Sequence, residues 1–181
     1  MLRYNEITVT VPTKLILLRI LLIPIFLALY FCDWEFGRVS ALVVFAIASI
    51  SDLFDGVLAR ARGQMTDFIK VMDPLADKLL ICSALIALLS LHEVAAWFVI
   101  LTVCRDFAIT ALRLFAAGQN KIAGAVISGK AGTACQMFLV IVILADMPIA
   151  ATVLLWTAAA LIIISAAENF IREWEVVKRI I

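Results

Sequence analysis

Six apolar stretches constrain the fold more than any other feature of this chain. Each has about the 20 residues that a helix needs to cross a bilayer, and they lie near residues 15–32, 40–61, 73–91, 95–117, 122–146 and 149–171. Hydrophobic residues make up 65% of the sequence, whereas a soluble domain is about 45–50% apolar. The core that a soluble fold would need is too large for 181 residues. We therefore predict an all-α integral membrane protein, with six transmembrane helices in one bundle.

The distribution of basic residues orients the predicted helices. With six spans, both termini lie on one side, and that side carries Arg3, Lys14, Arg60, Arg62, Lys70, Lys121, Arg172, Lys178 and Arg179. Arg38 is the only Lys or Arg expected on the opposite side. By the positive-inside rule, both termini are cytoplasmic. We expect a cytoplasmic or interfacial segment at 1–14, a membrane domain at 15–171 and a short cytoplasmic tail at 172–181. We expect a bacterial inner membrane as its location and no nucleic acid as its partner.

Four aspartates stand inside or beside these apolar stretches, on the cytoplasmic side. Asp52 and Asp55 come at the end of one stretch, and Asp73 and Asp77 at the start of the next. The spacings of three and four residues place each pair on one helix face. Asp73 followed by Pro74 is typical of an N-cap and a first-turn proline, which predicts that the helix begins there. Two antiparallel helices then bring four carboxylates together.

A carboxylate within the membrane costs about 2.5–3.5 kcal/mol and marks a functional site by default. Four carboxylates suit two divalent cations about 3.5–4 Å apart, which orient a phosphate group. Mg²⁺ or Mn²⁺ prefers such oxygen ligands. Gly56 leaves room for a ligand near the backbone, and Arg60 is placed to bind a phosphate. The alternative is a set of polar contacts between helices or surface charges at helix ends.

A second set of charges, Arg105, Arg113 and Lys130, lies in apolar stretches on the same side as the aspartates. Arg105 and Arg113 share a helix face two turns apart. These cations indicate a binding site for a second anion. The alternative is that they pair with Asp106 or Glu168, or that they extend toward lipid headgroups.

Arg19, in the first apolar stretch, has two interpretations. It extends to the headgroups or joins the anion site. Four small residues gather in the fifth stretch, namely Gly124, Ser128, Gly129 and Gly132. We interpret them as a surface for close helix packing.

The aspartate motif resembles that of the CDP-alcohol phosphotransferases. Their pattern Asp-x2-Asp-Gly-x2-Ala-Arg-x8-Gly-x3-Asp-x3-Asp is matched here by Asp52, Asp55, Gly56, Ala59, Arg60, Asp73 and Asp77. The resemblance runs from Pro12 to about Arg172. The segments Asp73-Pro-Leu-Ala-Asp77-Lys and Arg105 to Arg113, with Gly129-Lys130, are similar to the phosphatidylglycerophosphate synthase branch of the family.

The resemblance implies a homodimer of six-helix subunits that uses CDP-diacylglycerol and glycerol 3-phosphate as substrates. It implies two divalent cations, Mg²⁺ or Mn²⁺, held by the four aspartates. Nucleotide contacts are implied for Asp52, Gly56, Arg60 and Thr66. Asp77 is implied as the general base that activates a hydroxyl of glycerol 3-phosphate, with CMP as the leaving group. Arg105, Arg113 and Lys130 are implied to hold the acceptor's phosphate.

Two positions depart from the family pattern. The second motif glycine is replaced by Ile69, a β-branched residue that crowds the approach to the nucleotide. In the first stretch, Ile16 stands where relatives often have a threonine. Neither position is an expected metal ligand.

Three other functions stay open at this point. One is a cardiolipin synthase of the same family, which takes phosphatidylglycerol as the acceptor. Another is a weakly active or non-catalytic paralogue that binds CDP-lipid, supported by Ile69. The last is a divalent-cation transporter, although the aspartates lie at one end of the helices rather than along a path.

Overall fold

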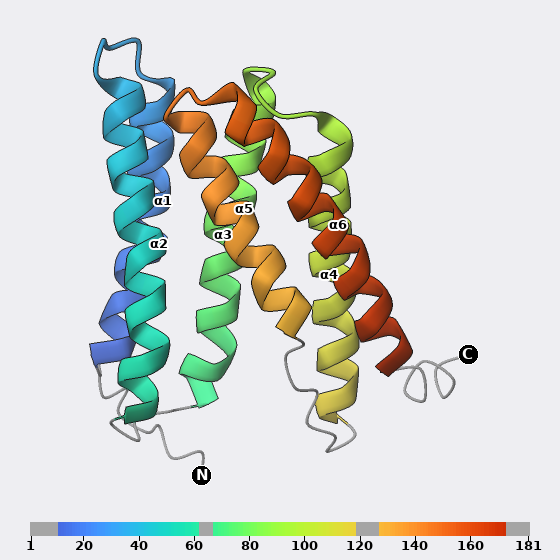
Figure 1. Ribbon diagram of the computed structural model, residues 1–181. Helices are drawn as coiled ribbons and strands as arrows, with labels where there is room; N and C mark the ends of the chain where they lie inside the picture. The colour runs from blue at the N-terminus through green and yellow to red at the C-terminus, as the bar shows by residue number, and fades with distance from the viewer. Residues whose placement is uncertain (1–10, 62–66, 119–126, 173–181) are drawn as a thin grey trace. The chain divides into compact units, whose positions relative to one another are not determined.

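The structure, a computed structural model, describes residues 11–61, 67–118 and 127–172 of the chain. Within these ranges it contains six α-helices and no strand (Figure 1). The helices are α1 (Val11–Phe31), α2 (Gly37–Ala61), α3 (Asp67–Ser90), α4 (Ala96–Gly118), α5 (Ile127–Leu144) and α6 (Pro148–Arg172). The contacts divide the chain into two units, Met1–Leu80 and Ile81–Ile181, so that α3 begins in the first unit and ends in the second. The predicted all-α class and the six helical stretches are confirmed.

Helices α1 and α2 form a hairpin in the first unit, and they lie side by side in Figure 1. Aromatic side chains fill their contact. The ring of Phe26 stacks on Tyr30 at 5.9 Å between centroids and meets the ring of Phe45 on α2 at 5.6 Å. Phe26 and Phe45 are fully buried. Such aromatic pairs add to the stabilisation from burial alone, so they fix the alignment of the two helices.

In the second unit, α6 packs against both α5 and α4. The buried residues come from all three helices and are mostly aliphatic or small, as Val99, Leu139, Val140, Ala158 and Ile162 illustrate. This arrangement places polar residues of α4, α5 and α6 within reach of one another. That proximity creates the cluster around Arg105 that is described below.

The turn from α5 to α6 is a Schellman motif. Asp146 adopts a left-handed conformation with φ of 57°. Its N–H donates to the carbonyl of Ile143 at 3.0 Å, and the N–H of Met147 donates to the carbonyl of Val142 at 3.1 Å. These bonds satisfy carbonyls that the end of a helix leaves unpaired. The same pattern ends α3 at His92, where φ is 61°, so the lone histidine of the chain has a backbone role.

The predicted start of the third helix at Asp73 is wrong. Helix α3 begins at Asp67, which places Asp73 and Pro74 inside the helix rather than at its N-terminus. A proline inside a helix removes one hydrogen bond, but neighbouring groups compensate for this loss in helices of membrane proteins. Helix α1 also contains an internal proline, Pro24. The Asp-Pro pair therefore does not mark a boundary here.

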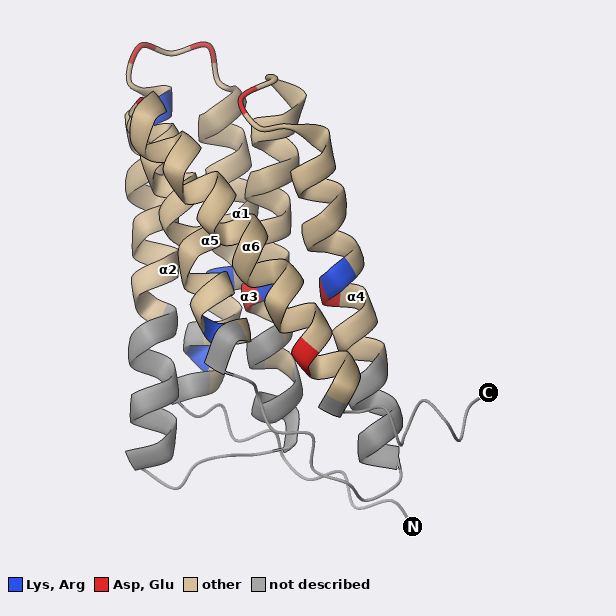
Figure 2. Cartoon of the chain, turned by 45° about the vertical axis from the view of Figure 1, so that its right-hand side comes forward, with Lys and Arg blue, Asp and Glu red and all other residues tan. Residues whose placement is uncertain are grey.

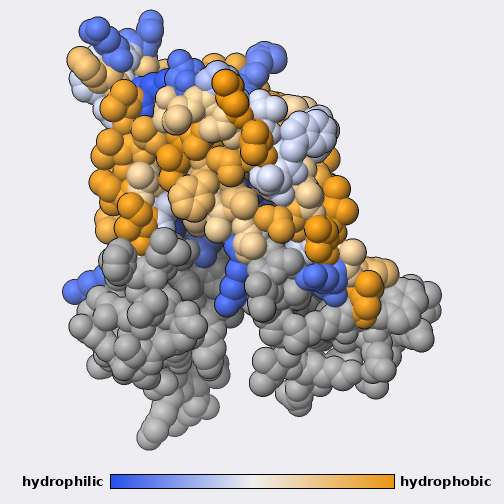
Figure 3. Space-filling view, in the orientation of Figure 1, coloured by the Kyte–Doolittle hydropathy of each residue, from blue (hydrophilic) through white to orange (hydrophobic). Residues whose placement is uncertain are grey.

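The described surface is largely apolar, as Figure 3 shows for one face. On α6 alone, Ile149, Val153, Trp156, Ile163 and Phe170 are exposed. Asp33 and Glu35 lie in the turn between α1 and α2. Figure 2 shows acidic residues (red) in turns that connect the helices. An apolar surface of this extent is suited to contact with lipid.

Among the described residues, one helical stretch, Pro148–Ile171, is both long and apolar enough to span a membrane. Three shorter apolar stretches are Ile16–Phe31, Gly37–Ser51 and Gly129–Leu144. The crossing of a membrane by all six helices, with both termini cytoplasmic, therefore stays a prediction.

The start of α2 supplies a test of close packing. A Cβ atom at Gly37 would lie 2.9 Å from the carbonyl oxygen of Leu29 and 3.0 Å from that of Cys32, both of them backbone atoms. We expect Gly37→Ala to lower the midpoint of thermal unfolding in detergent by several degrees, because overpacking costs about 1–3 kcal/mol. Gly132→Ala is the control, since its Cβ would meet Leu161 no closer than 3.7 Å. Equal midpoints for the two variants would contradict the expectation.

Candidate active site

The first unit carries the residues of the aspartate motif. Asp52, Asp55, Gly56 and Arg60 lie near the C-terminal end of α2. Asp73 and Asp77 lie one turn apart on α3. Of the four aspartates, only Asp77 has a described side chain. The side chain of Arg60 and the whole of Thr66 also lie outside the described residues. The convergence of the four carboxylates therefore stays a prediction.

The structure pairs Asp77 with Arg19, a residue of α1. The Nη1 atom of Arg19 donates a hydrogen bond to Oδ1 of Asp77 within an ion pair. The Arg19 side chain is fully buried, and that of Asp77 is 20% exposed. A buried guanidinium is stable only when it is paired, because removal from water costs several kcal/mol. Full burial excludes the extension of Arg19 to the lipid headgroups, and its observed partner is the candidate general base. Its membership of the anion site stays a prediction.

Apolar residues pack next to this ion pair. Ile16 lies one turn before Arg19 on α1 and is 1% exposed, and it belongs to one buried cluster with Ala76, the neighbour of Asp77. Met72 packs against the same cluster. The side chain at position 16, where the family often has a threonine, thus fills the contact between α1 and α3.

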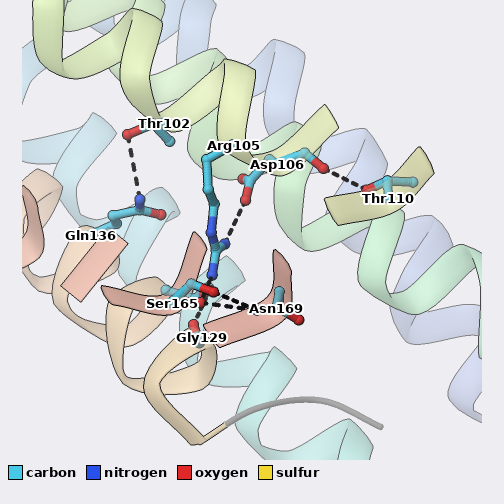
Figure 4. Close-up of polar contacts among 9 residues, drawn as sticks. Thr102, Arg105, Asp106, Thr110, Gly129, Gln136, Ser165 and Asn169 are labelled. Carbon is cyan, nitrogen blue, oxygen red and sulfur yellow. Dashed lines mark hydrogen bonds and ion pairs between the residues drawn. The ribbon is translucent and has the colours of Figure 1, made fainter. Parts of the chain in front are cut away.

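The second unit contains a polar cluster centred on Arg105 of α4 (Figure 4). Its Nη1 donates to Oδ1 of Asp106 at 2.7 Å, and its Nη2 donates to the Oγ atom of Ser165 on α6 at 2.5 Å. The side chains of Arg105 and Asp106 are each 10% exposed. The pairing of Arg105 with Asp106 is the alternative considered from the sequence. Its role toward an acceptor phosphate stays a prediction.

Further polar contacts support this cluster from α6. The Nδ2 atom of Asn169 donates to the backbone carbonyl of Ser165 at 2.7 Å and to its hydroxyl at 3.3 Å. Ser165 and Asn169 are buried. Neither residue is expected from the sequence. Their spacing of four within an apolar helix, which places two polar side chains on one face, is the signal that identifies them.

The other expected acceptor residues lie on α4 and α5. Lys130 is exposed, next to Gly129 in the first turn of α5. Arg113 lies on α4, and its side chain is outside the described part. The structure therefore connects Arg105 with Ser165 but does not test whether these three cations act together.

Within the described residues, no group of three or more His, Cys, Asp or Glu side chains is placed to hold a metal ion. Asp77 is among the described side chains, whereas those of Asp52, Asp55 and Asp73 are not. The residue types nevertheless fit hard divalent cations, because aspartate supplies only oxygen ligands. The two-cation site stays a prediction.

Comparison with known proteins is consistent with the motif. A sequence model described as CDP-alcohol phosphatidyltransferase matches residues 9–164. A Bacillus subtilis protein named CDP-diacylglycerol–glycerol-3-phosphate 3-phosphatidyltransferase is 36% identical over 186 residues, covering 92% of this chain and 96% of that protein. A Rickettsia bellii protein of the same name is 32% identical over 91% of this chain and 96% of its own length.

A partial match extends the comparison to another group of bacteria. A Mycobacterium tuberculosis protein named probable phosphatidylglycerophosphate synthase is 45% identical over 103 residues, covering 55% of this chain and 49% of that protein. The match to the family extends over most of the chain and includes the aspartate motif. This chain therefore belongs to the CDP-alcohol phosphatidyltransferase family and is an enzyme of that class.

Proposed function

We propose that the enzyme transfers the phosphatidyl group of CDP-diacylglycerol to sn-glycerol 3-phosphate, which gives phosphatidylglycerophosphate and CMP. The observation that carries this proposal is the similarity to the Bacillus subtilis protein along nearly the full length of both chains. The complete set of motif aspartates supports it, because the chemistry needs all four.

In this proposal Asp77 is the general base. Its carboxylate accepts the proton of the attacking hydroxyl group of glycerol 3-phosphate. The hydroxyl oxygen forms a bond to the phosphorus that carries diacylglycerol. The bond from that phosphorus to CMP breaks, and CMP leaves with the electron pair. Arg19 orients the Asp77 carboxylate through the ion pair.

The remaining motif residues bind and orient the substrates. Asp52, Asp55, Asp73 and Asp77 would hold two Mg²⁺ or Mn²⁺ ions. When bound, such ions stabilise charge on the attacking and leaving oxygens. We assign the nucleotide to Asp52, Gly56, Arg60 and Thr66, and the acceptor phosphate to Arg105, Arg113 and Lys130.

We further propose how the enzyme lies in the membrane. Its six helices, within residues 15–171, cross the inner membrane with both termini in the cytoplasm, and the motif faces the cytoplasm. The basic residues near the termini favour this orientation. CDP-diacylglycerol then enters from the lipid, and glycerol 3-phosphate enters from the water. The enzyme acts as a homodimer, as the resemblance to the family implies.

Release of CMP by the purified protein tests the proposed function. With CDP-diacylglycerol present, we expect release only when both glycerol 3-phosphate and Mg²⁺ or Mn²⁺ are added, because the reaction needs an acceptor and charge stabilisation. Phosphatidylglycerol replaces glycerol 3-phosphate in a parallel reaction. Release with phosphatidylglycerol alone would identify a cardiolipin synthase. CDP-diacylglycerol binding without any release would indicate a non-catalytic paralogue.

The general-base role of Asp77 gives a second expectation. Asp77→Asn keeps the size of the side chain but removes its ability to accept a proton, so we expect kcat to fall by about 10²–10⁴-fold or more. Binding of CDP-diacylglycerol persists. The control is Asp146→Asn, the same substitution at an exposed turn residue. Turnover by Asp77→Asn at the wild-type rate would exclude this role.

The ion pair gives a third expectation. Arg19→Met replaces the charged side chain by an apolar one of similar length and so removes the partner that orients Asp77. We expect kcat to fall at least about tenfold, because small displacements of a reacting group are costly, while KM for CDP-diacylglycerol stays near the wild-type value. Lys14→Met, an exposed position on the same helix, is the control. A folded Arg19→Met variant with unchanged kcat would show that the ion pair serves only packing.

A further inference from the structure

Three helices of the second unit meet at the guanidinium group of Arg105. Arg105 comes from α4, Ser165 from α6 and Gly129 from α5 (Figure 4). The guanidinium of an arginine is planar and carries five N–H donors in a fixed geometry. Contacts at two of its three nitrogens therefore fix the orientation of the whole group, including the direction of the N–H bond on the third nitrogen.

Both terminal nitrogens of Arg105 are held, and they are held from different helices. Asp106 accepts from Nη1, and Ser165 accepts from Nη2. The Nε atom is buried and has no hydrogen-bond partner among the described residues. A buried N–H without an acceptor is costly, so proteins rarely leave one unless a ligand completes it. This donor leaves room for a further acceptor beside Arg105, and a phosphate oxygen is one that a guanidinium binds well.

The hydroxyl of Ser165 is itself held in place. It accepts from Asn169, one turn further along α6, as well as from Arg105. Ser165 is completely buried. The Ser165 oxygen that accepts the hydrogen bond from Arg105 Nη2 is therefore held in place by the α6 backbone and by Asn169. It thereby fixes the position of the guanidinium.

A side chain at position 129 would crowd this contact. A Cβ atom at Gly129 would lie 3.1 Å from Arg105 Nη2 and 3.1 Å from Ser165 Oγ, which is tighter than ordinary contact. At Gly132, by contrast, the nearest atom would be Leu161 Cβ at 3.7 Å. The packing interpretation of the small residues on α5 therefore suits Gly132, whereas Gly129 makes room for two polar groups.

From this geometry we infer that Ser165 and Gly129 are positioning residues, which hold the Arg105 guanidinium in the orientation that binds the phosphate group of the acceptor. The inference rests on the proposed function for the identity of that ligand, a phosphate monoester. Ser165 acts by accepting a hydrogen bond, and Gly129 acts by leaving space. Neither residue has to touch the substrate.

Direct binding of glycerol 3-phosphate tests this inference without turnover. Isothermal titration would use the purified full-length protein in detergent, as wild type, Ser165→Ala, Gly129→Ala and Gly132→Ala. We expect the first two variants to bind glycerol 3-phosphate roughly tenfold more weakly, because each disturbs a hydrogen bond of a charged group. Gly132→Ala stays within about twofold of wild type, since its new methyl group meets ordinary contacts.

The affinity for CDP-diacylglycerol, measured on the same samples, separates positioning from a general loss of structure. The inference requires that Ser165→Ala and Gly129→Ala keep wild-type affinity for this second ligand. It is overturned if both affinities fall together, if neither falls, or if Gly132→Ala weakens binding as much as Gly129→Ala does. It is also overturned if the wild type does not bind glycerol 3-phosphate.

Failure of the proposed function has a different signature. In that case the wild type binds glycerol 3-phosphate, and the two variants bind it more weakly, but no CMP is released from CDP-diacylglycerol. The positioning role of Ser165 and Gly129 would then stand, and the assigned reaction would not.

Discussion

The pairing of buried charges is the constraint on which this structure depends most. Arg19 has no exposed surface, and its ion pair with Asp77 connects α1 to α3 within an apolar contact. Loss of one partner from such a pair is expected to cost about 3–5 kcal/mol, because the other charge stays buried. The pair therefore links the stability of the first unit to the placement of the candidate general base. A chain this apolar keeps buried charges only where they serve such a purpose.

The same constraint acts in the second unit with different chemistry. Arg105 is balanced by a carboxylate from its own helix and by a hydroxyl from α6, so its charge is paired while its direction is set by another element. Asp106 compensates the positive charge of Arg105, and Ser165 contacts its guanidinium from another helix. In the first unit α1 supplies the arginine that pairs with a motif aspartate, and in the second unit α6 supplies the hydroxyl that accepts a hydrogen bond from an arginine. On the functions proposed above, α1 and α6 contribute to the enzyme by orienting these side chains.

Much of the fold could be predicted, because apolar stretches of about 20 residues leave few alternatives to helices. The start of α3 could not, because Asp73-Pro74 has the composition of a helix N-terminus although the helix continues through it. The family was identified from the spacing of the aspartates, which is local information. The partner of Arg19 lies 58 residues away, and Ser165, the partner of Arg105 from another helix, lies 60 residues away. Such pairings depend on how helices pack, which periodicity along one helix does not reveal.

The most direct test of the account identifies the lipid product. Purified enzyme would be incubated with CDP-diacylglycerol, Mg²⁺ or Mn²⁺ and carbon-13-labelled glycerol 3-phosphate, and the lipids would be analysed by mass spectrometry. The account predicts a new lipid in which phosphatidic acid is joined to one labelled glycerol phosphate unit. A reaction that yields phosphatidic acid alone, or a lipid without the label, would contradict it.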